Sequence, residues 1–269
     1  MAVITQLGVL GAGPMGSAII RGALGSGLVA AADVLVVDHD DSARDAMAAL
    51  GCSVGADAAV LADHPMVLLA VRPQDFADAV QSLHGDTLRL AISVMAGLNT
   101  VSIAASMGSG TRVVRTMPNT AASIGEAVVG ICPGIDATAA DVSQARALLS
   151  GVGRTVDVEE SQMHAVTAVS GSGPAYVYLL AEAIEAEALE LGLDQVQINA
   201  LLRGMLLGAT MLFDADERGP AALREAVTTP GGTTQAGLEA MRAAGFVDAV
   251  RAGVRAACER GQHLSGEGV

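Results

Sequence analysis

The sequence contains no lysine, and all 15 of its basic residues are arginines. The sequence has 29 acidic residues, so its formal net charge is −14. The arginines form no basic cluster. A surface of this sign repels a phosphate backbone. We therefore expect no nucleic acid partner.

Cysteine is scarce as well. The chain has three cysteines, an odd number, and they are far apart in the sequence: Cys52, Cys132 and Cys258. This spacing excludes a disulfide framework and a paired-cysteine metal site, so we expect reduced thiols and no bound metal. Residues 1–6 lack the basic segment of a signal peptide, and we expect a cytoplasmic protein. Residues 90–111 are uncharged over the length of a membrane span, but their polar residues and glycine favour a buried strand, turn and helix. We expect no membrane association.

Several catalytic signatures are also missing, among them the nucleophile elbow, the H-E-x-x-H zinc motif and the Walker loop. No histidine has a carboxylate, serine or cysteine partner at a suggestive spacing, so each is expected on the surface or satisfied in the core. The five are His39, His64, His84, His164 and His263.

A glycine-rich turn near the N-terminus gives the first positive signal. Residues 6–10 are mostly apolar and lead directly into Gly11-Ala12-Gly13-Pro14-Met15-Gly16, after which apolar residues follow with helical spacing. A strand, this turn and a helix form the dinucleotide fingerprint in its required context. Gly11 makes the turn, Gly13 lets a pyrophosphate approach the backbone, and Gly16 lets helix and strand pack. We expect a nucleotide site here.

The chain changes character near residue 160. Before it, short strands alternate with helices, which predicts a mostly parallel sheet covered on both faces. After it, long Ala/Leu/Glu patterns predict helices alone. We expect an α/β protein with a Rossmann-type dinucleotide-binding domain (1–160) and an all-α dimerisation and substrate-binding domain (161–269). The expected strands are 6–10, 34–37, 66–70, 90–94, 113–116, 127–131 and 155–158, and the expected helices are 14–25, 75–83, 137–149, 175–191, 194–214, 221–227, 233–244 and 246–264.

The helical half carries more apolar residues than one buried stripe needs. Residues 201–213, for example, include five leucines and two methionines before ending on a phenylalanine. A helix that is apolar nearly all round is usually buried, so we expect an extensive helical dimer interface, or alternatively a larger monomer core.

Asp38 ends the second expected strand. An acid at this place typically binds the adenosine ribose hydroxyls, which favours NADH and repels the 2′-phosphate of NADPH. Asp40 and Asp41 add to the repulsion, and Arg44 is the nearby cation. The alternative is a loop of solvated acids.

Three further segments follow expected strands, where open α/β sheets bind ligands. Ala70-Val71-Arg72-Pro73 offers a cation to a phosphate or ribose, although an exposed arginine needs no function. Val94-Met95-Ala96 closes the next strand. Asn119 orients the nicotinamide or substrate, or simply makes an Asx-turn.

The segment Thr229-Pro230-Gly231-Gly232-Thr233-Thr234 precedes a helical pattern. Its proline and glycines favour a tight turn, and free N–H groups at the helix start attract a small carboxylate. A capped helix start is the alternative. Residues 168–176 also suggest a helix start, with Ser172 near the cap and Pro174 in the first turn, which capping explains fully.

Together these residues resemble the pyrroline-5-carboxylate reductase family over essentially the whole chain. The similar strings are G-A-G-P-M-G-S-A, A-V-R-P, V-R-T-M-P-N-T, A-V-T-A-V-S-G-S-G-P-A-Y and V-T-T-P-G-G-T-T-Q-A-G-L, in the family's order. The resemblance implies dimers or rings of dimers, and hydride transfer from NADH or NADPH to the C=N carbon of the substrate, giving L-proline. It also implies that Thr229, Gly232 and Thr233 hold the substrate carboxylate, that Thr234 hydrogen-bonds the ring nitrogen, and that Glu217 lies near the pocket.

The sequence departs from the family pattern at several positions. Asp38, His39 and Asp40 stand where relatives usually offer Ser/Thr and Arg to a 2′-phosphate, and Asp57 replaces a cofactor-binding Asn of many relatives. These changes favour NADH. Milder changes are Arg72 for Lys, Ala121 for Pro and Thr229 for Ser.

Three other functions share some of these sequence features. A 3-hydroxyacid or 6-phosphogluconate type dehydrogenase needs a catalytic lysine on its helical domain, which this sequence lacks. A reductase of another cyclic imine stays open, because ring size depends on pocket shape. A non-catalytic NAD(H)-binding dimer would use the late turn only as a cap, and would bind NADH without oxidising it.

Overall fold

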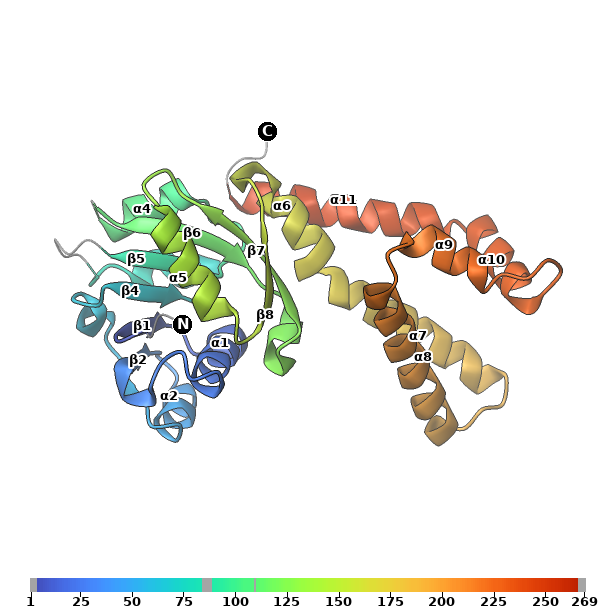
Figure 1. Ribbon diagram of the computed structural model, residues 1–269, viewed down its shortest axis with the longest axis horizontal. Helices are drawn as coiled ribbons and strands as arrows, with labels where there is room; N and C mark the ends of the chain where they lie inside the picture. The colour runs from blue at the N-terminus through green and yellow to red at the C-terminus, as the bar shows by residue number, and fades with distance from the viewer. Residues whose placement is uncertain (1–3, 84–88, 109, 266–269) are drawn as a thin grey trace. The chain divides into compact units, whose positions relative to one another are not determined.

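The computed structural model describes residues 4–83, 89–108 and 110–265. The chain forms two compact units, Met1–Ser172 together with Ala256–Val269, and Gly173–Arg255. The first unit contains all the described strands, and the second is helical (Figure 1).

The first unit is built on an eight-stranded sheet of order β3-β2-β1-β4-β5-β6-β7-β8. Every neighbouring pair is parallel except β6 and β7, which are antiparallel. The order 3-2-1-4-5-6 is that of a doubly wound dinucleotide-binding sheet, so the expected Rossmann-type fold is confirmed. The strands are β1 (Leu7–Leu10), β2 (Val34–Val37), β3 (Ser53–Gly55), β4 (Met66–Leu69), β5 (Leu90–Ser93), β6 (Arg112–Met117), β7 (Ala127–Pro133) and β8 (Gly153–Asp157).

Apolar side chains cover both faces of this sheet. Along β4, Met66 and Leu68 join one buried cluster, while Val67 and Leu69 join another. Successive side chains of a strand point to opposite faces, so an unbroken apolar run supplies two cores at once. This is why β1, β2 and β4 contain no polar side chain.

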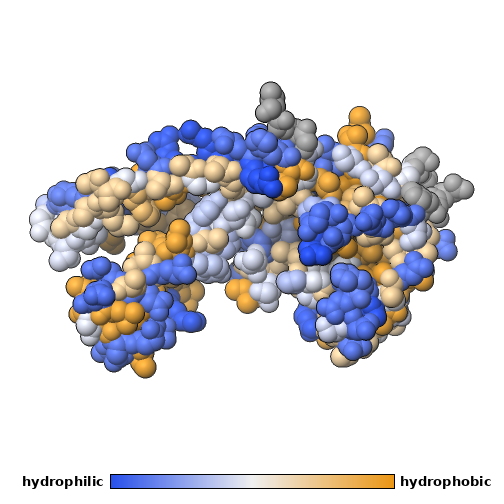
Figure 2. All heavy atoms as spheres, turned by 180° about the vertical axis from the view of Figure 1, so that it is seen from behind, coloured by the Kyte–Doolittle hydropathy of each residue, from blue (hydrophilic) through white to orange (hydrophobic). Residues whose placement is uncertain are grey.

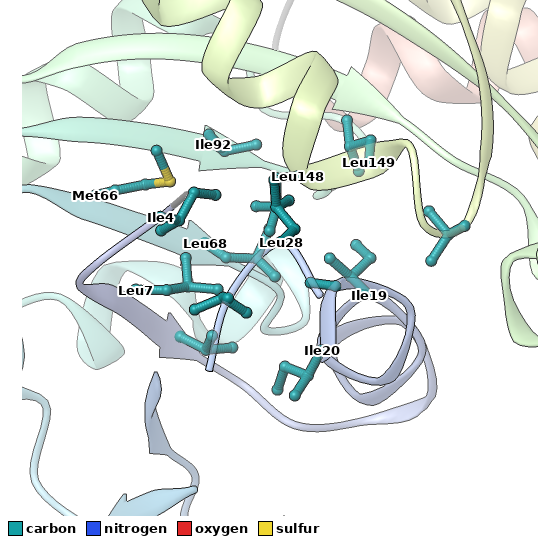
Figure 3. Close-up of a cluster of buried hydrophobic side chains, with 14 of the residues drawn as sticks. Ile4, Leu7, Ile19, Ile20, Leu28, Met66, Leu68, Ile92, Leu148 and Leu149 are labelled. Carbon is teal, nitrogen blue, oxygen red and sulfur yellow. The ribbon is translucent and has the colours of Figure 1, made fainter. Parts of the chain in front are cut away.

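Helices close the sheet on each side. In the first cluster, Ile19 and Ile20 of α1 (Pro14–Gly25) approach the strands together with Leu148 and Leu149 of α5 (Ala139–Leu149), as Figure 3 shows. All four of these side chains are fully buried. The second cluster includes residues of α3 (Phe76–Ala79) and α4 (Thr100–Met107), and α2 (Asp41–Ala48) follows β2.

Most expected elements of this unit are confirmed to within a few residues, and residues 90–107 form the expected strand, turn and helix. The expected helix 75–83 is wrong in length. A 3-10 turn at Pro73–Asp75 leads into α3, which ends at Ala79. Strand β3 was not expected, because it is only three residues long and shows no apolar pattern.

The chain leaves the sheet through two linked helical segments. Helix α6 (Met163–Val166) continues into a π turn at Thr167–Gly171, in which the Ser172 N–H donates to the Thr167 carbonyl at 2.8 Å. A helix does begin at Gly173 with Pro174 in its first turn, as expected. The expectation that Ser172 caps it is wrong, since Ser172 has helical φ and ψ of −84° and −20°. Segments of this π type often occur at functional sites.

The last described residues return to the first unit. Ser265 Oγ lies 3.4 Å from Nε2 of the buried His164, and a Cβ on Gly261 would lie 3.0 Å from His164 Nδ1. Leu264 packs so closely on Gly97 that a Cβ there would meet the Leu264 Cβ at 2.9 Å. The C-terminal segment is thus part of the packing of this unit.

The helical elements expected after residue 173 are confirmed, with bounds shifted by at most two residues. They are α7 (Gly173–Glu190), α8 (Gln195–Ala215), α9 (Gly219–Ala226), α10 (Thr233–Ala243) and α11 (Phe246–Leu264), whose final residues belong to the first unit.

Helices α7 and α8 expose many apolar side chains. In the described monomer Leu201, Leu207 and Met211 are each more than 60% exposed, and Figure 2 shows apolar patches on this part of the molecule. Among the described helices, α8 is the one long and apolar enough to cross a membrane, by length and composition only. A monomer rarely exposes so continuous an apolar surface, which therefore marks an interaction face.

Candidate cofactor and substrate sites

The turn between β1 and α1 is compact at two glycines and open at the third. Gly11 has φ of +98°, and a Cβ there would lie 2.7 Å from the Ala70 carbonyl oxygen. A Cβ on Gly16 would overlap the Gly11 carbonyl oxygen. At Gly13, in contrast, a Cβ would meet nothing within 4 Å. A ligand can therefore approach the backbone at Gly13 more closely than at a residue with a side chain.

Helix α1 begins immediately after this turn. Gly13 is its N-cap without a side-chain cap, and Pro14 occupies the first turn, where its missing N–H costs nothing. The following N–H groups at Met15 and Gly16 precede the first intrahelical bond, since Ser17 N donates to the Gly13 carbonyl at 2.9 Å. Such an uncapped start favours an anion.

A cavity of about 770 Å³ lies at the carboxyl ends of β1, β2 and β4. This is the edge at which doubly wound sheets bind nucleotides. Ala12, Met15, Gly16 and Pro73 are not among its lining residues, although Ala12, Met15 and Pro73 are each next to one in the sequence. The expected residues that it brings together are Gly11, Gly13, Pro14, Asp38, Asp57, Ala70, Val71 and Arg72.

Asp38 is held in place by the glycine turn. Its Oδ2 accepts a hydrogen bond from the Ala12 N–H at 2.6 Å, and its Oδ1 accepts one from the Asp40 N–H at 2.9 Å. The side chain is 10% exposed, and His39 Nδ1 lies 3.4 Å from Oδ1. A carboxylate has about four acceptor positions, so capacity remains for ribose hydroxyls.

The cavity lining is acidic. Asp40, Asp75 and Asp78 line it together with Asp38 and Asp57. Hydrogen bonds from the Ser42 side chain and backbone lower the pKa of Asp40 and keep this carboxylate charged.

Arg72 is the guanidinium among these lining residues. Its Nε already pairs with Asp75 Oδ2 at 2.6 Å, so its charge is largely neutralised. The charged side chains of the lining are therefore mostly carboxylates.

Asp57 has a neighbour that the sequence did not suggest. Its Oδ1 accepts hydrogen bonds from the Ala59 N–H at 2.9 Å and from Ser82 Oγ at 3.3 Å. Ser82 is 25 residues away and also lines the cavity. No short-range signal in the sequence could have found this pair.

The segments after β5 and β6 do not line this cavity. Val94, Met95 and Ala96 follow β5, with Met95 buried. Asn119 follows β6, accepts a hydrogen bond from the Ala121 N–H at 3.2 Å and donates one to Ser170 Oγ at 3.3 Å. The structure thus shows the Asx-type cap that was one of the two expectations for Asn119.

The late proline–glycine turn lies in the second unit, just before α10. Gly231 has φ of +71°, and the Gly232 N–H donates to the Thr229 carbonyl at 3.0 Å, which closes the turn. Thr233 begins the helix after the N-cap Gly232, which has no side-chain cap. The N–H groups of Thr233 and Thr234 therefore face outward at the positive end of the helix.

Glu217 is exposed in the turn between α8 and α9. It stands between Asp216 and Arg218, whose side chains pair at 2.6 Å, and Arg218 lowers the pKa of Asp216 to about 2. The predicted cofactor residues thus lie in the first unit, and the predicted substrate residues lie in the second.

Metal-ligating groups do not gather in the part of the chain that the structure describes, where no cluster of three His, Cys, Asp or Glu side chains occurs. The three cysteines are free thiols, and burial raises the pKa of Cys132 to about 12. His84 lies outside the described residues.

Two family models match separate parts of the chain. Residues 160–264 match the model described as pyrroline-5-carboxylate reductase dimerisation. Residues 6–97 match the model described as NADP oxidoreductase, coenzyme F420-dependent. The second match spans the glycine turn and all the residues that line the cavity.

Individual relatives extend over nearly the whole chain. Pyrroline-5-carboxylate reductase of Methanosarcina acetivorans is 36% identical over 263 residues, which cover 96% of this chain and 97% of that protein. Pyrroline-5-carboxylate reductase 2 of Bacillus subtilis is 35% identical over 91% of this chain and 90% of its own length. The crystal structure of the Plasmodium falciparum pyrroline carboxylate reductase with NADP bound matches with a TM-score of 0.89, at 25% identity over 98% of this chain and 100% of that chain. The chain therefore belongs to the pyrroline-5-carboxylate reductase family.

Proposed function

We propose that this chain reduces Δ1-pyrroline-5-carboxylate to L-proline with NADH or NADPH, the final step of proline synthesis. The observation that carries this proposal is the extent of the match, because relatives of that name align with both the sheet unit and the helical unit. The acceptor is a C=N bond, and the nitrogen of a cyclic imine can arrive protonated. This agrees with a sequence that has no lysine and no histidine paired for acid catalysis.

The cofactor site of the proposal lies at the carboxyl ends of β1, β2 and β4. The residues there fit a dinucleotide, since Gly13 leaves open the space that a Cβ would fill and α1 starts beside it. The pyrophosphate would meet this turn, and Asp38 would accept hydrogen bonds from the ribose. When bound, the reduced nicotinamide supplies the hydride. Val94, Met95, Ala96 and Asn119 are proposed to lie beside its ring.

NADH is the proposed preferred cofactor. The acidic lining and the pairing of Arg72 with Asp75 support this preference, because a 2′-phosphate would bring further negative charge to these carboxylates. Asp57 would contact the cofactor through its Oδ2, since its Oδ1 already accepts two hydrogen bonds.

The substrate site of the proposal lies at the start of α10. The N–H groups of Thr229 and Thr233 would donate hydrogen bonds to the substrate carboxylate. The Thr234 hydroxyl would hydrogen-bond the ring nitrogen. The Gly232 N–H already bonds the Thr229 carbonyl, so it would act as a shared donor. Glu217 is proposed near the same pocket. Catalysis is then mainly positioning.

The proposed functional division places the cofactor domain at 1–160 and the dimerisation and substrate domain at 161–269, and the family match beginning at residue 160 supports it. The apolar faces of α7 and α8 would be covered in a homodimer, which leaves no need for a membrane. Rings of dimers and a cytoplasmic location complete the proposal.

Loss of NADH absorbance, and separately of NADPH absorbance, in the presence of Δ1-pyrroline-5-carboxylate tests the proposed function. Rapid oxidation is expected with both, faster with NADH. Oxidation with a six-membered cyclic imino acid but not with the five-membered one would move the substrate to another imine. Binding of NADH without oxidation by either would contradict the enzymatic function.

A further inference from the structure

Arg44 lies beside the residue proposed to bind the adenosine ribose. It belongs to α2, and its Nη1 donates to the main-chain carbonyl of Asp38 at 2.7 Å. Its side chain is 19% exposed, so the guanidinium is fixed against the end of β2. In NADPH, a phosphate on the ribose 2′-oxygen would replace the hydroxyl that faces the Asp38 carboxylate. The Arg44 guanidinium contacts the main chain of this same residue. Arginine at such a place usually accommodates the 2′-phosphate of NADPH.

In this chain, Arg44 already has an anionic partner. Its Nη2 pairs with Asp41 Oδ1, three residues earlier on the same helix. The guanidinium therefore has one nitrogen on a carbonyl oxygen and another on a carboxylate. An added phosphate would have to compete with Asp41 for this cation and would also be repelled by it.

The three acids of this segment have different roles. Asp38 holds the glycine turn through the Ala12 N–H, and Asp40 caps α2 through the Ser42 N–H at 2.9 Å. Each of these two carboxylates thus also accepts a hydrogen bond from the backbone. The Asp41 side chain is 88% exposed, and the contact described for it is the pair with Arg44. Its role is therefore electrostatic.

We propose that Asp41 is a specificity-determining residue for the cofactor: by pairing with Arg44, it withholds that guanidinium from a 2′-phosphate and favours NADH over NADPH. This inference rests on the proposed cofactor site. It assigns the discrimination to an ion pair outside the cavity lining, in addition to the carboxylate of Asp38 inside it.

Binding of two cofactor fragments tests this inference without turnover. Isothermal titration calorimetry would measure the Kd values of ADP-ribose and 2′-phospho-ADP-ribose for the full-length protein and for Asp41→Asn. We expect 2′-phospho-ADP-ribose to bind Asp41→Asn more tightly by at least about threefold, the size of effect that exposed ion pairs commonly have. The Kd of ADP-ribose should stay within about twofold.

Two further variants separate the pair from bulk charge. Asp45→Asn removes the same charge from the same helix, at an exposed position in the next residue after Arg44. It should leave both Kd values nearly unchanged. In Asp41→Asn/Arg44→Gln the gain for 2′-phospho-ADP-ribose should vanish, because the released guanidinium is absent.

Equal gains in affinity for 2′-phospho-ADP-ribose in Asp41→Asn and Asp45→Asn would overturn the inference, since the loss of one negative charge anywhere on the helix would then explain them. No gain in Asp41→Asn, with ADP-ribose still bound, would overturn it and leave the proposed reductase function intact. If ADP-ribose bound to none of the proteins, the proposed cofactor site would itself be wrong.

Discussion

Gly13→Ala offers a sharp test of the open position in the glycine turn. A methyl group there meets no protein atom within 4 Å, and the backbone has φ of −61° and ψ of −171°, which alanine adopts without strain. The added carbon would occupy the space through which a pyrophosphate approaches the backbone. We therefore expect the protein to fold normally and to lose affinity for NADH.

The expected effect on stability follows from two opposing terms. Alanine for glycine at an allowed φ and ψ stabilises a protein by about 0.4–1 kcal/mol through the unfolded state. Alanine is a poorer N-cap than glycine, which costs about 0.5–1 kcal/mol. The terms nearly cancel, so Tm should move by no more than about 2 °C. The Kd of NADH should rise by at least about tenfold, equivalent to about 1.4 kcal/mol.

Gly16→Ala is the matched control, because its methyl group overlaps the Gly11 carbonyl oxygen. Overpacking of this kind costs about 1–3 kcal/mol, and Tm should fall by several degrees. Differential scanning calorimetry and titration of NADH on both variants give the two quantities. A Gly13→Ala protein whose Kd for NADH is within twofold of the parent value would refute the placement of the pyrophosphate.

Thr234→Ala should lower kcat at least about tenfold with unchanged Tm, while Thr234→Ser should retain activity; full activity of the alanine variant in a steady-state assay would remove the proposed hydroxyl contact. Asp38→Asn should shift the ratio of kcat/KM for NADH to that for NADPH towards NADPH by about tenfold, and an unchanged ratio would contradict the role of this carboxylate. Leu201→Glu, on an apolar face of α8, should produce monomers in sedimentation velocity, and a persisting dimer would place the interface elsewhere. Because burial raises the pKa of Cys132 to about 12, iodoacetamide at pH 8 should label it only after denaturation, as mass spectrometry would show.

The fold was largely predictable because its signals are local. The strand 34–37 and the helices 14–25 and 246–264 have the predicted bounds, since each apolar run or periodic pattern ends at a clear break. Prediction failed where tertiary packing decides the structure. Beyond Ala79 the chain forms turns, yet it buries Val80 and Leu83 as a helix would have done, so the apolar spacing alone was misleading.

The candidate site was predictable only in its glycines and strand ends. The fingerprint spacing identified Gly13, and the geometry at this residue has the openness that the fingerprint requires. The hydrogen bond from Ala12 to Asp38 joins residues 26 positions apart, and that from Ser82 to Asp57 spans 25. Such contacts depend on how strands are ordered in the sheet, which no local pattern encodes.

The return of the C-terminal segment to the sheet unit has a consequence for biosynthesis. The contacts of His164 with Ser265 and of Gly97 with Leu264 join parts of the chain separated by the whole helical unit. On the ribosome, the sheet can form early, but these contacts wait until residues 261–265 have emerged. A fragment that ends at residue 172 would therefore lack the residues that pack on His164. The helical unit is an insertion in the chain of the sheet unit, which both precedes and follows it in the sequence.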